Sequence, residues 1–307
     1  MSKVLVTGGA GFIGSHLVDA YLRAGHKVSI VDDLSTGKKA NVNNKATFHN
    51  VSINDKKLED VIKNEKPDIV SHLAAQISVK ESMQDPVKDA ETNVVGSLNL
   101  LNLCHKYGVK RFIFSSTGGA LYGEPKYLPC DEEHHIQPLS GYGVSKRSLE
   151  LYLMAYGPIW NLPFVILRYA NVYGPRQDPF GEAGVVAIFA RRMLKGEPVT
   201  INGTGKQSRD FVYVSDVVRA NLIATENGTG GIYNIGTAKG TSVNEIFTHL
   251  KKETGYKLSA KHAPAIPGEV GNIYLKSDKA KRELAWAPTV VLEEGLQKTV
   301  EYFRKAE

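Results

Sequence analysis

The sequence contains only two cysteines, Cys104 and Cys130, among 307 residues. Two thiols form neither a disulfide framework nor the clustered ligands of a structural metal site, so we expect no metal and a reducing, cytoplasmic location. No apolar run reaches the roughly 18 residues that a membrane-spanning helix needs. The start, MSKVLVTGG, lacks a charged and then apolar leader. We therefore expect neither a membrane segment nor a signal peptide.

The charged residues do not cluster. Lys and Arg number 38 against 32 Asp and Glu, which gives a net charge of +6, yet no basic run is longer than Lys38-Lys39. Proteins that bind nucleic acid concentrate positive charge and interleave it with aromatic residues, so we expect no nucleic-acid partner. Solvated surface lysines explain the excess charge, and a small polyanionic substrate is the alternative.

Strand and helix patterns alternate over the first two-thirds of the chain. Short apolar runs predict strands, and between them apolar residues recur at helical spacing. The predicted strands are 3–8, 26–33, 67–74, 110–116 and 162–170, and the predicted helices are 12–25, 55–66, 87–108 and 140–157. This order predicts an α/β fold of the Rossmann type, with a doubly wound parallel sheet.

The pattern changes after residue 170, where residues 171–183 form a loop rich in Gly and Pro. The later elements are shorter and less regular, and a chain of this length is typical of two domains of about 150 residues each. We therefore predict a dinucleotide-binding domain at residues 1–170 and a smaller C-terminal α/β substrate domain at 171–307. The strand predicted at 231–236 returns to the first sheet.

A glycine-rich motif, TGGAGFIG at 7–14, lies between the first predicted strand and helix. Its glycines at 8, 11 and 14 suit a tight turn, close approach of the backbone to a pyrophosphate, and close helix packing. Asp32 ends the next strand, where a carboxylate accepts hydrogen bonds from the adenosine ribose. This acid favours NAD over NADP, whose 2′-phosphate it would repel, although Lys38 and Lys39 leave NADP as an alternative. A plain strand–turn–helix, without a ligand, also fits the motif alone.

A second group of polar residues begins where the strand at 110–116 ends, with Thr117, and continues with Tyr142 and Lys146 in GYGVSK. Residues i and i+4 share a helix face, so the Lys146 ammonium can lie near the Tyr142 phenol and lower its pKa. Tyr142 could then act as a general base for a hydroxyl proton, and Thr117 could hydrogen-bond the same substrate oxygen. Alone, such a pair is typical of an amphipathic surface helix.

The order of these motifs resembles the extended short-chain dehydrogenase/reductase family, and most of all its nucleotide-sugar epimerases of the UDP-glucose 4-epimerase type. The resemblance includes TGGAGFIGSHL, HLAAQ, SSTGGALYGEP, YGVSK, LRYANVYGPRQ, RDFVYVSDV and KAKRELAW. It implies that NAD is bound by Gly8, Gly11, Phe12, Ile13, Gly14, Asp32, Asp33, Leu34, Ser35, Gly37, Ser52, Ile53, Leu73, Ala74, Ala75, Gln76, Asn93, Ser115, Tyr142, Lys146 and Tyr169. It implies that a UDP-sugar is bound by Ser78, Thr117, Tyr142, Asn171, Val185, Thr200, Asn202 and Arg209.

The activity that the resemblance implies is NAD-dependent 4-epimerisation of UDP-glucose and UDP-galactose or of a related UDP-sugar pair. Tyr142 takes the C4 hydroxyl proton as C4 gives hydride to NAD, and the 4-keto sugar turns over before the hydride returns to its other face. Family members are usually homodimers, joined by the helices that correspond here to 86–107 and 142–156.

Three other functions stay open. A 4,6-dehydratase or decarboxylase of the same family begins with the same oxidation, but relatives place acidic residues directly after the strand-end hydroxyl. This chain has the uncharged Gly-Gly-Ala at 118–120. An NADP-dependent reductase conflicts with Asp32, and a dinucleotide-binding protein without activity would not need the Thr, Tyr and Lys of the catalytic group.

Some positions depart from the family pattern. Ser52 stands where many members have an Asp for the adenine amino group, and Ile266 stands where many have an Arg on the phosphates. We therefore expect Arg209 to be the main charged side chain on the pyrophosphate, with a lysine such as Lys206 or Lys276 as the alternative. His134 and His135 lie in an acidic sequence, which we interpret as a solvated loop rather than a metal site.

Overall fold

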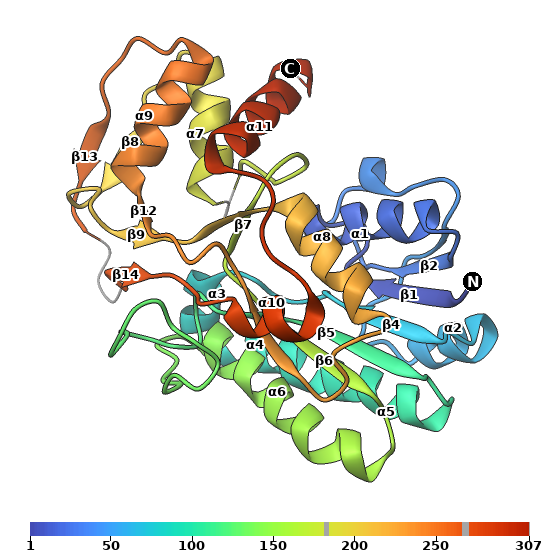
Figure 1. Ribbon diagram of the computed structural model, residues 1–307. Coiled ribbons are helices and arrows are strands. Elements are labelled where there is room, and N and C mark those ends of the chain that lie inside the picture. The colour runs from blue at the N-terminus through green and yellow to red at the C-terminus, as the bar shows by residue number, and fades with distance from the viewer. Residues whose placement is uncertain (181–183, 266–269, 307) are drawn as a thin grey trace.

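A seven-stranded sheet forms the centre of the computed structural model, which describes residues 1–180, 184–265 and 270–306 (Figure 1). The strand order is β3-β2-β1-β4-β5-β6-β11, and all neighbours are parallel. The strands are β1 (Lys3–Thr7), β2 (Lys27–Val31), β3 (Thr47–His49), β4 (Ile69–His72), β5 (Arg111–Thr117), β6 (Phe164–Tyr169) and β11 (Ile232–Ile235). The predicted doubly wound α/β fold is confirmed.

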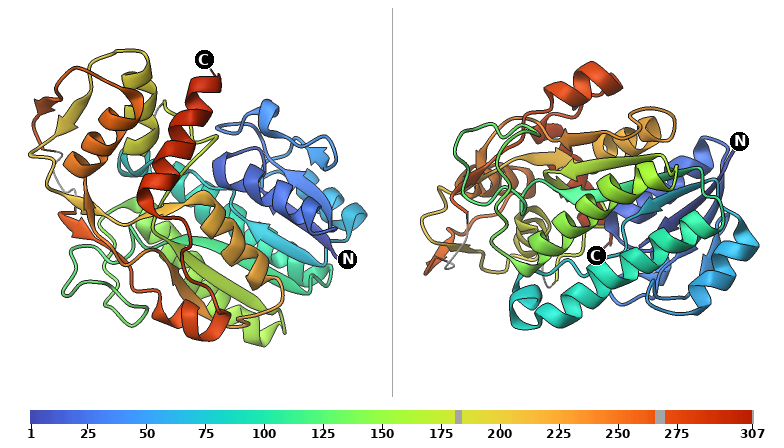
Figure 2. Two further views of the ribbon diagram at one scale, coloured as in Figure 1. Left: turned by 45° about the horizontal axis from the view of Figure 1, so that its top comes forward. Right: turned by 90° about the horizontal axis from the view of Figure 1, so that it is seen from below.

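Helices cover both faces of this sheet (Figures 1 and 2). They are α1 (Phe12–Arg23) and α8 (Val214–Ala224) on one face, and α2 (Lys57–Glu65), α5 (Ser97–Lys106) and α6 (Gly141–Ile159) on the other. Successive side chains of a strand point to opposite faces, so Val4 and Val6 of β1 join the first core and Leu5 joins the second. Burial on both faces explains why these strands read as nearly continuous apolar runs.

The helix predicted at 87–108 is interrupted. After α3 (Val79–Gln84), α4 (Pro86–Ala90) leads into a π-helical turn at Glu91–Gly96 and then into α5. The i→i+5 bonds of a π turn change which residues before and after it share a face, and such turns are frequent at functional sites. This segment lies against α6.

The later part of the chain forms smaller elements beside the sheet (Figure 1). They are β7 (Asn171–Tyr173), α7 (Val185–Leu194), β8 (Thr200–Asn202), β9 (Ser208–Arg209), β10 (Phe211–Tyr213), β12 (Thr241–Ser242), α9 (Val243–Thr254), β13 (Lys261–Ala263), β14 (Asn272–Ile273), α10 (Asp278–Leu284) and α11 (Leu292–Ala306). A short 3-10 helix, η1 (Lys39–Asn41), lies earlier, between β2 and β3. β7 pairs with β10, β8 with β13, and β9 with both β12 and β14. The predicted loop at 171–183 therefore begins with a strand, which corrects that expectation.

The chain returns once to the main sheet, because β11 pairs with β6. The strand predicted at 231–236 is thus part of the first sheet, while the division of the chain at residue 170 stays a prediction. Both cysteines are buried and free. Among the described residues, no group of metal ligands is found, and no helix there has the length and apolar character to cross a membrane.

Candidate active site

The glycine-rich segment is a tight loop between β1 and α1. Gly8 has a φ of 70°, and a Cβ at this position would lie 2.8 Å from the Ala74 nitrogen. A Cβ on Gly14 would lie 2.1 Å from the Gly8 carbonyl oxygen, so a side chain there would force α1 away from the loop. Gly11 directly precedes α1, whose first N–H groups lack intrahelical partners and attract an anion. The loop therefore has the features that a pyrophosphate needs.

Asp32 joins the segment after β2 to the glycine-rich loop. Its Oδ2 accepts a hydrogen bond from the Ala10 nitrogen at 2.9 Å, and its Oδ1 accepts one from the Leu34 nitrogen at 2.8 Å. A Cβ on Gly37 would lie 2.6 Å from Oδ1, so the segment closes tightly over the carboxylate. Burial raises the pKa of Asp32, against the two N–H donors that lower it. The acid lies where the sequence pattern predicts, at the carboxyl end of β2.

The two lysines that kept NADP open are engaged by other groups. Lys38 Nζ pairs with Asp178 Oδ1 at 2.7 Å. Lys39 Nζ lies 3.6 Å from the centroid of the Phe48 ring, a cation–π contact. Both lysines therefore have partners other than Asp32 in this structure.

The loop after β4 is held against β1 and the π-helical turn. Thr7 Oγ1 accepts hydrogen bonds from the nitrogens of Leu73 and Ala74, both at 3.2 Å. Asn93 bonds both sides of the Gln76 backbone: its Oδ1 accepts from the nitrogen and its Nδ2 donates to the carbonyl oxygen, each at 2.8 Å. The structure thus brings these predicted cofactor residues together beside the glycine-rich loop.

Tyr142 and Lys146 share a face of α6, as predicted. Lys146 Nζ lies 5.8 Å from the centroid of the Tyr142 ring and donates a hydrogen bond to the Ser115 carbonyl oxygen at 3.1 Å. Burial lowers the pKa of Lys146 to about 8. The predicted lowering of the Tyr142 pKa is wrong for this structure: burial raises it, and the carboxylate of Asp89 raises it further. The i, i+4 spacing correctly predicted that the Lys146 ammonium lies beside Tyr142. It does not reveal how deeply the phenol is buried or that Asp89 lies near it.

Thr117, at the end of β5, lies near Asn171, the first residue of β7. A Cβ on Gly119 would lie 3.5 Å from Asn171 Oδ1 and 4.0 Å from Thr117 Oγ1, so both polar side chains border the same glycine. Ser115 and Tyr169 meet on neighbouring strands, where their hydroxyl oxygens are 3.0 Å apart. These predicted residues therefore lie at one edge of the sheet, at the carboxyl ends of β5 and β6.

The other predicted substrate residues come from separate elements: Ser78 caps α3, Val185 begins α7, Thr200 and Asn202 belong to β8, and Arg209 ends β9. An open cavity of about 360 Å³ is lined by Asn202, Gly203, Thr204, Lys206, Gln207, Ala265, Val270, Gly271 and Asn272. Arg209 Nη1 donates hydrogen bonds to the carbonyl oxygens of Ser208 at 2.9 Å and Gly271 at 3.1 Å. Arg209 therefore lies beside this cavity. Ile266, whose expected effect was the loss of a phosphate contact, is outside the described residues.

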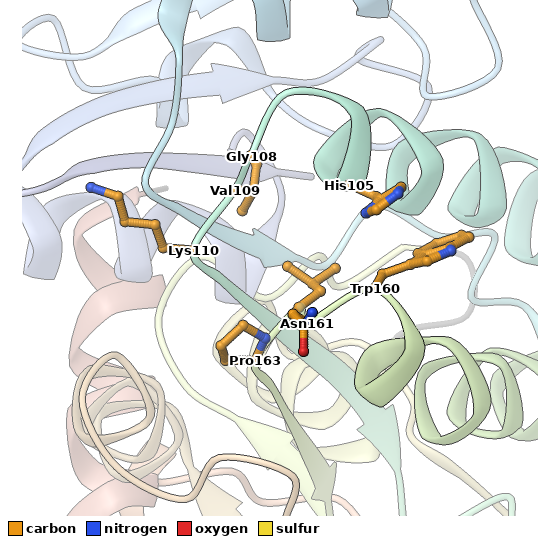
Figure 3. A pocket seen from close by; sticks show the side chains of 8 residues that line it. His105, Gly108, Val109, Lys110, Trp160, Asn161 and Pro163 are labelled. Atoms are coloured by element: carbon orange, nitrogen blue, oxygen red, sulfur yellow. The ribbon is translucent and has the colours of Figure 1, made fainter.

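A second cavity, of about 370 Å³, lies elsewhere (Figure 3). It is lined by His105, Gly108, Val109, Lys110, Trp160, Asn161, Leu162 and Pro163. Several of these residues directly precede β5 and β6, so the cavity lies at the amino ends of the strands. Ligands of open α/β sheets bind at the carboxyl ends, where the glycine-rich loop, Asp32 and Thr117 lie. The candidate site is therefore at the opposite edge from this cavity.

Sequence reasoning missed two buried carboxylates beside the Tyr–Lys pair. Asp89 is 1 % exposed and Glu150 is completely buried. Glu150 stands four residues after Lys146, a spacing that could have revealed it. Asp89 stands four residues before Asn93, and only the π turn and the fold reveal its position.

The interpretation of the two adjacent histidines also needs correction. His134 is 3 % exposed and packs against the rings of Tyr122 and Tyr127. Its Nε2 accepts a hydrogen bond from the Lys126 nitrogen at 3.1 Å. The prediction of a solvated loop is therefore wrong for His134, which packs into the protein.

Comparison with known proteins shows what this arrangement resembles. Residues 4–236 match the NAD dependent epimerase/dehydratase family. The chain belongs to this family. Within it, the chain is 42 % identical to the UDP-glucose 4-epimerase of Mycolicibacterium smegmatis, over 98 % of both chains. The resemblance to nucleotide-sugar epimerases is thereby confirmed.

Two crystal structures of family members are closely similar. The UDP-glucose 4-epimerase of Thermotoga maritima, solved with UDP-glucose, has 53 % identity over 99 % of both chains and a TM-score of 0.98. The UDP-glucose 4-epimerase of Thermus thermophilus, solved with NAD, has 45 % identity over 99 % of this chain and 100 % of its own, with a TM-score of 0.95. The family fold therefore extends over the whole described chain.

Proposed function

We propose that this protein is an NAD-dependent UDP-glucose 4-epimerase. The observation that carries the proposal is the meeting of three features at one edge of the sheet: the glycine-rich loop with Asp32, the Tyr142–Lys146 pair, and Thr117 beside Asn171. Relatives of this similarity that were solved with UDP-glucose or with NAD support it.

The residues present fit NAD. Gly8 and Gly14 leave a loop that any Cβ would disrupt, and Asp32 adds a carboxylate that would repel the 2′-phosphate of NADP. When bound, oxidised NAD accepts a hydride from the sugar and returns it, and it brings a positive charge that opposes the raised Tyr142 pKa. We assign the dinucleotide to residues 1–170 together with β11, and the sugar nucleotide to residues 171–307, with Thr117 and Tyr142 of the first part reaching its sugar.

The chain's own residues hold the sugar and move a proton at its C4 hydroxyl. The Tyr142 phenol oxygen accepts this proton during oxidation and returns it during reduction. Lys146, fixed by the Ser115 carbonyl oxygen, stabilises the phenolate. Thr117 Oγ1 supplies a hydrogen bond to the same substrate oxygen. Arg209, beside the cavity at β8, would neutralise charge on the pyrophosphate.

The residues at this site disfavour a dehydratase or a decarboxylase. The chain does have relatives of the second kind, such as the UDP-glucuronic acid decarboxylase 1 of Xenopus tropicalis, which is 33 % identical over 99 % of this chain. Position 119 borders both Thr117 and Asn171, so a carboxylate there would reach the reacting sugar. Glycine occupies it. The chain therefore lacks at this point the acidic residue that we expect after the strand-end hydroxyl in the dehydratases and decarboxylases of the family.

We also propose a homodimer. The exposed side chains of Val87, Val95, Val144, Leu151 and Met154 are 45–67 % exposed and lie on α4, the π turn and α6, which pack side by side (Figure 2). Apolar residues gathered on adjacent helices indicate a protein–protein surface. A cytoplasmic location stays a prediction.

The test is catalytic. Purified protein should release NAD on acid extraction and convert UDP-galactose to UDP-glucose without added cofactor. Tyr142→Phe should retain NAD and lose roughly 10²- to 10⁴-fold in kcat, whereas Tyr152→Phe, on the same helix, should keep the parent rate. Turnover that consumes NADPH stoichiometrically, or a near-normal rate for Tyr142→Phe, would contradict the proposal.

A further inference from the structure

Asp89 is a buried carboxylate that connects two separate parts of the candidate site. Its Oδ1 accepts hydrogen bonds from Gln76 Nε2 at 2.8 Å and from Asn93 Nδ2 at 3.0 Å, and its Oδ2 accepts one from Ser145 Oγ. Gln76 belongs to the loop after β4, and Ser145 directly precedes Lys146 on α6. Asp89 therefore joins the predicted cofactor loop to the helix that carries the Tyr–Lys pair.

The partners of Asp89 differ from those of the other carboxylate near Lys146. Glu150 accepts hydrogen bonds from two guanidinium groups, those of Arg168 and Arg147. The hydrogen bonds of Asp89, in the part of the chain that the structure describes, come from an amide, a second amide and a hydroxyl. Burial of a charge is costly without a compensating charge or full hydrogen bonding. Neutral donors satisfy the hydrogen bonding of Asp89 but do not cancel its charge, so the electric field of the carboxylate at neighbouring groups stays strong in the protein interior.

Lys146 and Tyr142 are those neighbours. Lys146 faces Tyr142 and Glu150 on its own helix, Asp89 from α4, and His72 from β4. His72 is neutral, because burial lowers its pKa to about 3. The negative charge of Asp89 raises the pKa of both Lys146 and Tyr142.

We propose that Asp89 is a positioning residue for the Tyr142–Lys146 pair, which fixes α6 to the cofactor loop and maintains a negative charge beside both groups. This inference rests on the proposed function in that the pair performs the proton transfer. A negative charge opposes proton loss from both members of the pair. It therefore keeps Lys146 protonated, and it moves the pH range in which the phenolate and ammonium coexist to higher pH.

The test compares Asp89→Asn with Asp85→Asn. Asp85 is an exposed carboxylate four residues earlier whose capping bond to the Lys88 nitrogen an asparagine preserves. In the pH profile of kcat/KM for UDP-galactose, both limbs of Asp89→Asn should move to lower pH by about one unit. Those of Asp85→Asn should coincide with the parent. Unmoved limbs in Asp89→Asn would overturn the inference, because a merely structural role lowers the rate without moving them.

A second measurement does not need turnover. The protein is prepared with ¹³Cε-labelled lysine, and the Lys146 signal is identified by its loss in Lys146→Met. Its titration midpoint should fall by about one unit in Asp89→Asn. An inactive parent with this shift would refute the proposed function and leave the role of Asp89 supported, whereas an unshifted midpoint would refute the role of Asp89.

Ser145→Ala covers the case in which Asp89→Asn does not fold. This variant keeps the buried charge and removes the bond to α6, so kcat should fall about 10- to 100-fold with unmoved pH limbs. Ser148→Ala, which removes a hydroxyl bonded to the Val144 carbonyl oxygen on the same helix, should keep the parent kcat. A parent-like kcat for Ser145→Ala would show that the bond does not position the pair.

Discussion

Replacing Arg168 by methionine should destabilise the protein far more than replacing Arg147, although both arginines bond the same carboxylate. Arg168 Nε and Nη2 donate to Glu150 Oε1 and Oε2 at 2.9 and 2.8 Å, and both side chains are at most 1 % exposed. Arg147 Nη1 donates to Oε2 at 2.8 Å, but its side chain is 25 % exposed. Methionine fills similar volume without charge.

The magnitude follows from what each variant leaves behind. Arg168→Met leaves a fully buried carboxylate with two donors, the Ser116 hydroxyl at 2.7 Å from Oε1 and the partly exposed Arg147. Breaking a buried pair costs about 3–5 kcal/mol. Arg147→Met removes a bridge that reaches solvent, which is worth about 0–1 kcal/mol. At about 2 °C per kcal/mol, the thermal unfolding midpoint of Arg168→Met should lie roughly 6–10 °C below that of the parent.

The loss should depend on pH. In the parent, burial raises the pKa of Glu150, but the hydrogen bonds and charges of Arg168 and its other partners outweigh burial and lower it. A carboxyl group whose pKa is lower in the folded than in the unfolded protein stabilises the fold at pH values above its unfolded pKa. This stabilisation is lost as the pH falls through the folded pKa. Without Arg168, burial is the dominant effect on Glu150, so protonation of Glu150 removes the buried charge and stabilises the variant. The difference in stability between parent and Arg168→Met should therefore shrink between pH 7 and pH 4.

Thermal unfolding followed by circular dichroism at both pH values measures these effects. The double variant Glu150→Gln/Arg168→Met should recover part of the loss, because it removes the unpaired charge. Equal midpoints for Arg168→Met and Arg147→Met would refute the reasoning, as would a loss that does not change with pH.

Two further predictions concern binding and assembly. Arg209→Ala should weaken UDP binding about 10- to 100-fold, since a charge-assisted hydrogen bond is worth about 1.5–3 kcal/mol. Calorimetric titration with UDP measures the affinity, and Arg282→Ala, at an exposed arginine, is the control that should bind UDP like the parent. An unchanged affinity for UDP in Arg209→Ala would show that the phosphates bind elsewhere. If the proposed homodimer forms through α6, Leu151→Glu should be a monomer in analytical ultracentrifugation. Val291→Glu, at a comparably exposed apolar residue after α10, should remain a dimer. A dimeric Leu151→Glu would locate the interface on another surface.

Local patterns were sufficient for the fold and for the conformation of the glycine-rich loop. The alternation of Val4, Leu5 and Val6 between two cores is a property of any doubly covered strand, and the glycines at 8 and 14 are required by contacts within and beside the motif. His134 shows the opposite case. Its acidic neighbours in sequence suggested solvent, but burial depends on Tyr122 and Tyr127 as its packing partners, and the sequence does not reveal that packing.

The Tyr–Lys pair shows where prediction from spacing stops. Four residues on a helix determine that Lys146 lies beside Tyr142, and the structure agrees. The direction of the Tyr142 pKa instead depends on burial and on Asp89, which the π turn and the packing of α4 against α6 bring to the pair. The charged groups at this site thus come from two separate chain segments, α4 and α6. The geometry of the pair is therefore predictable from helix spacing, whereas the direction of the Tyr142 pKa follows only from the packing around it.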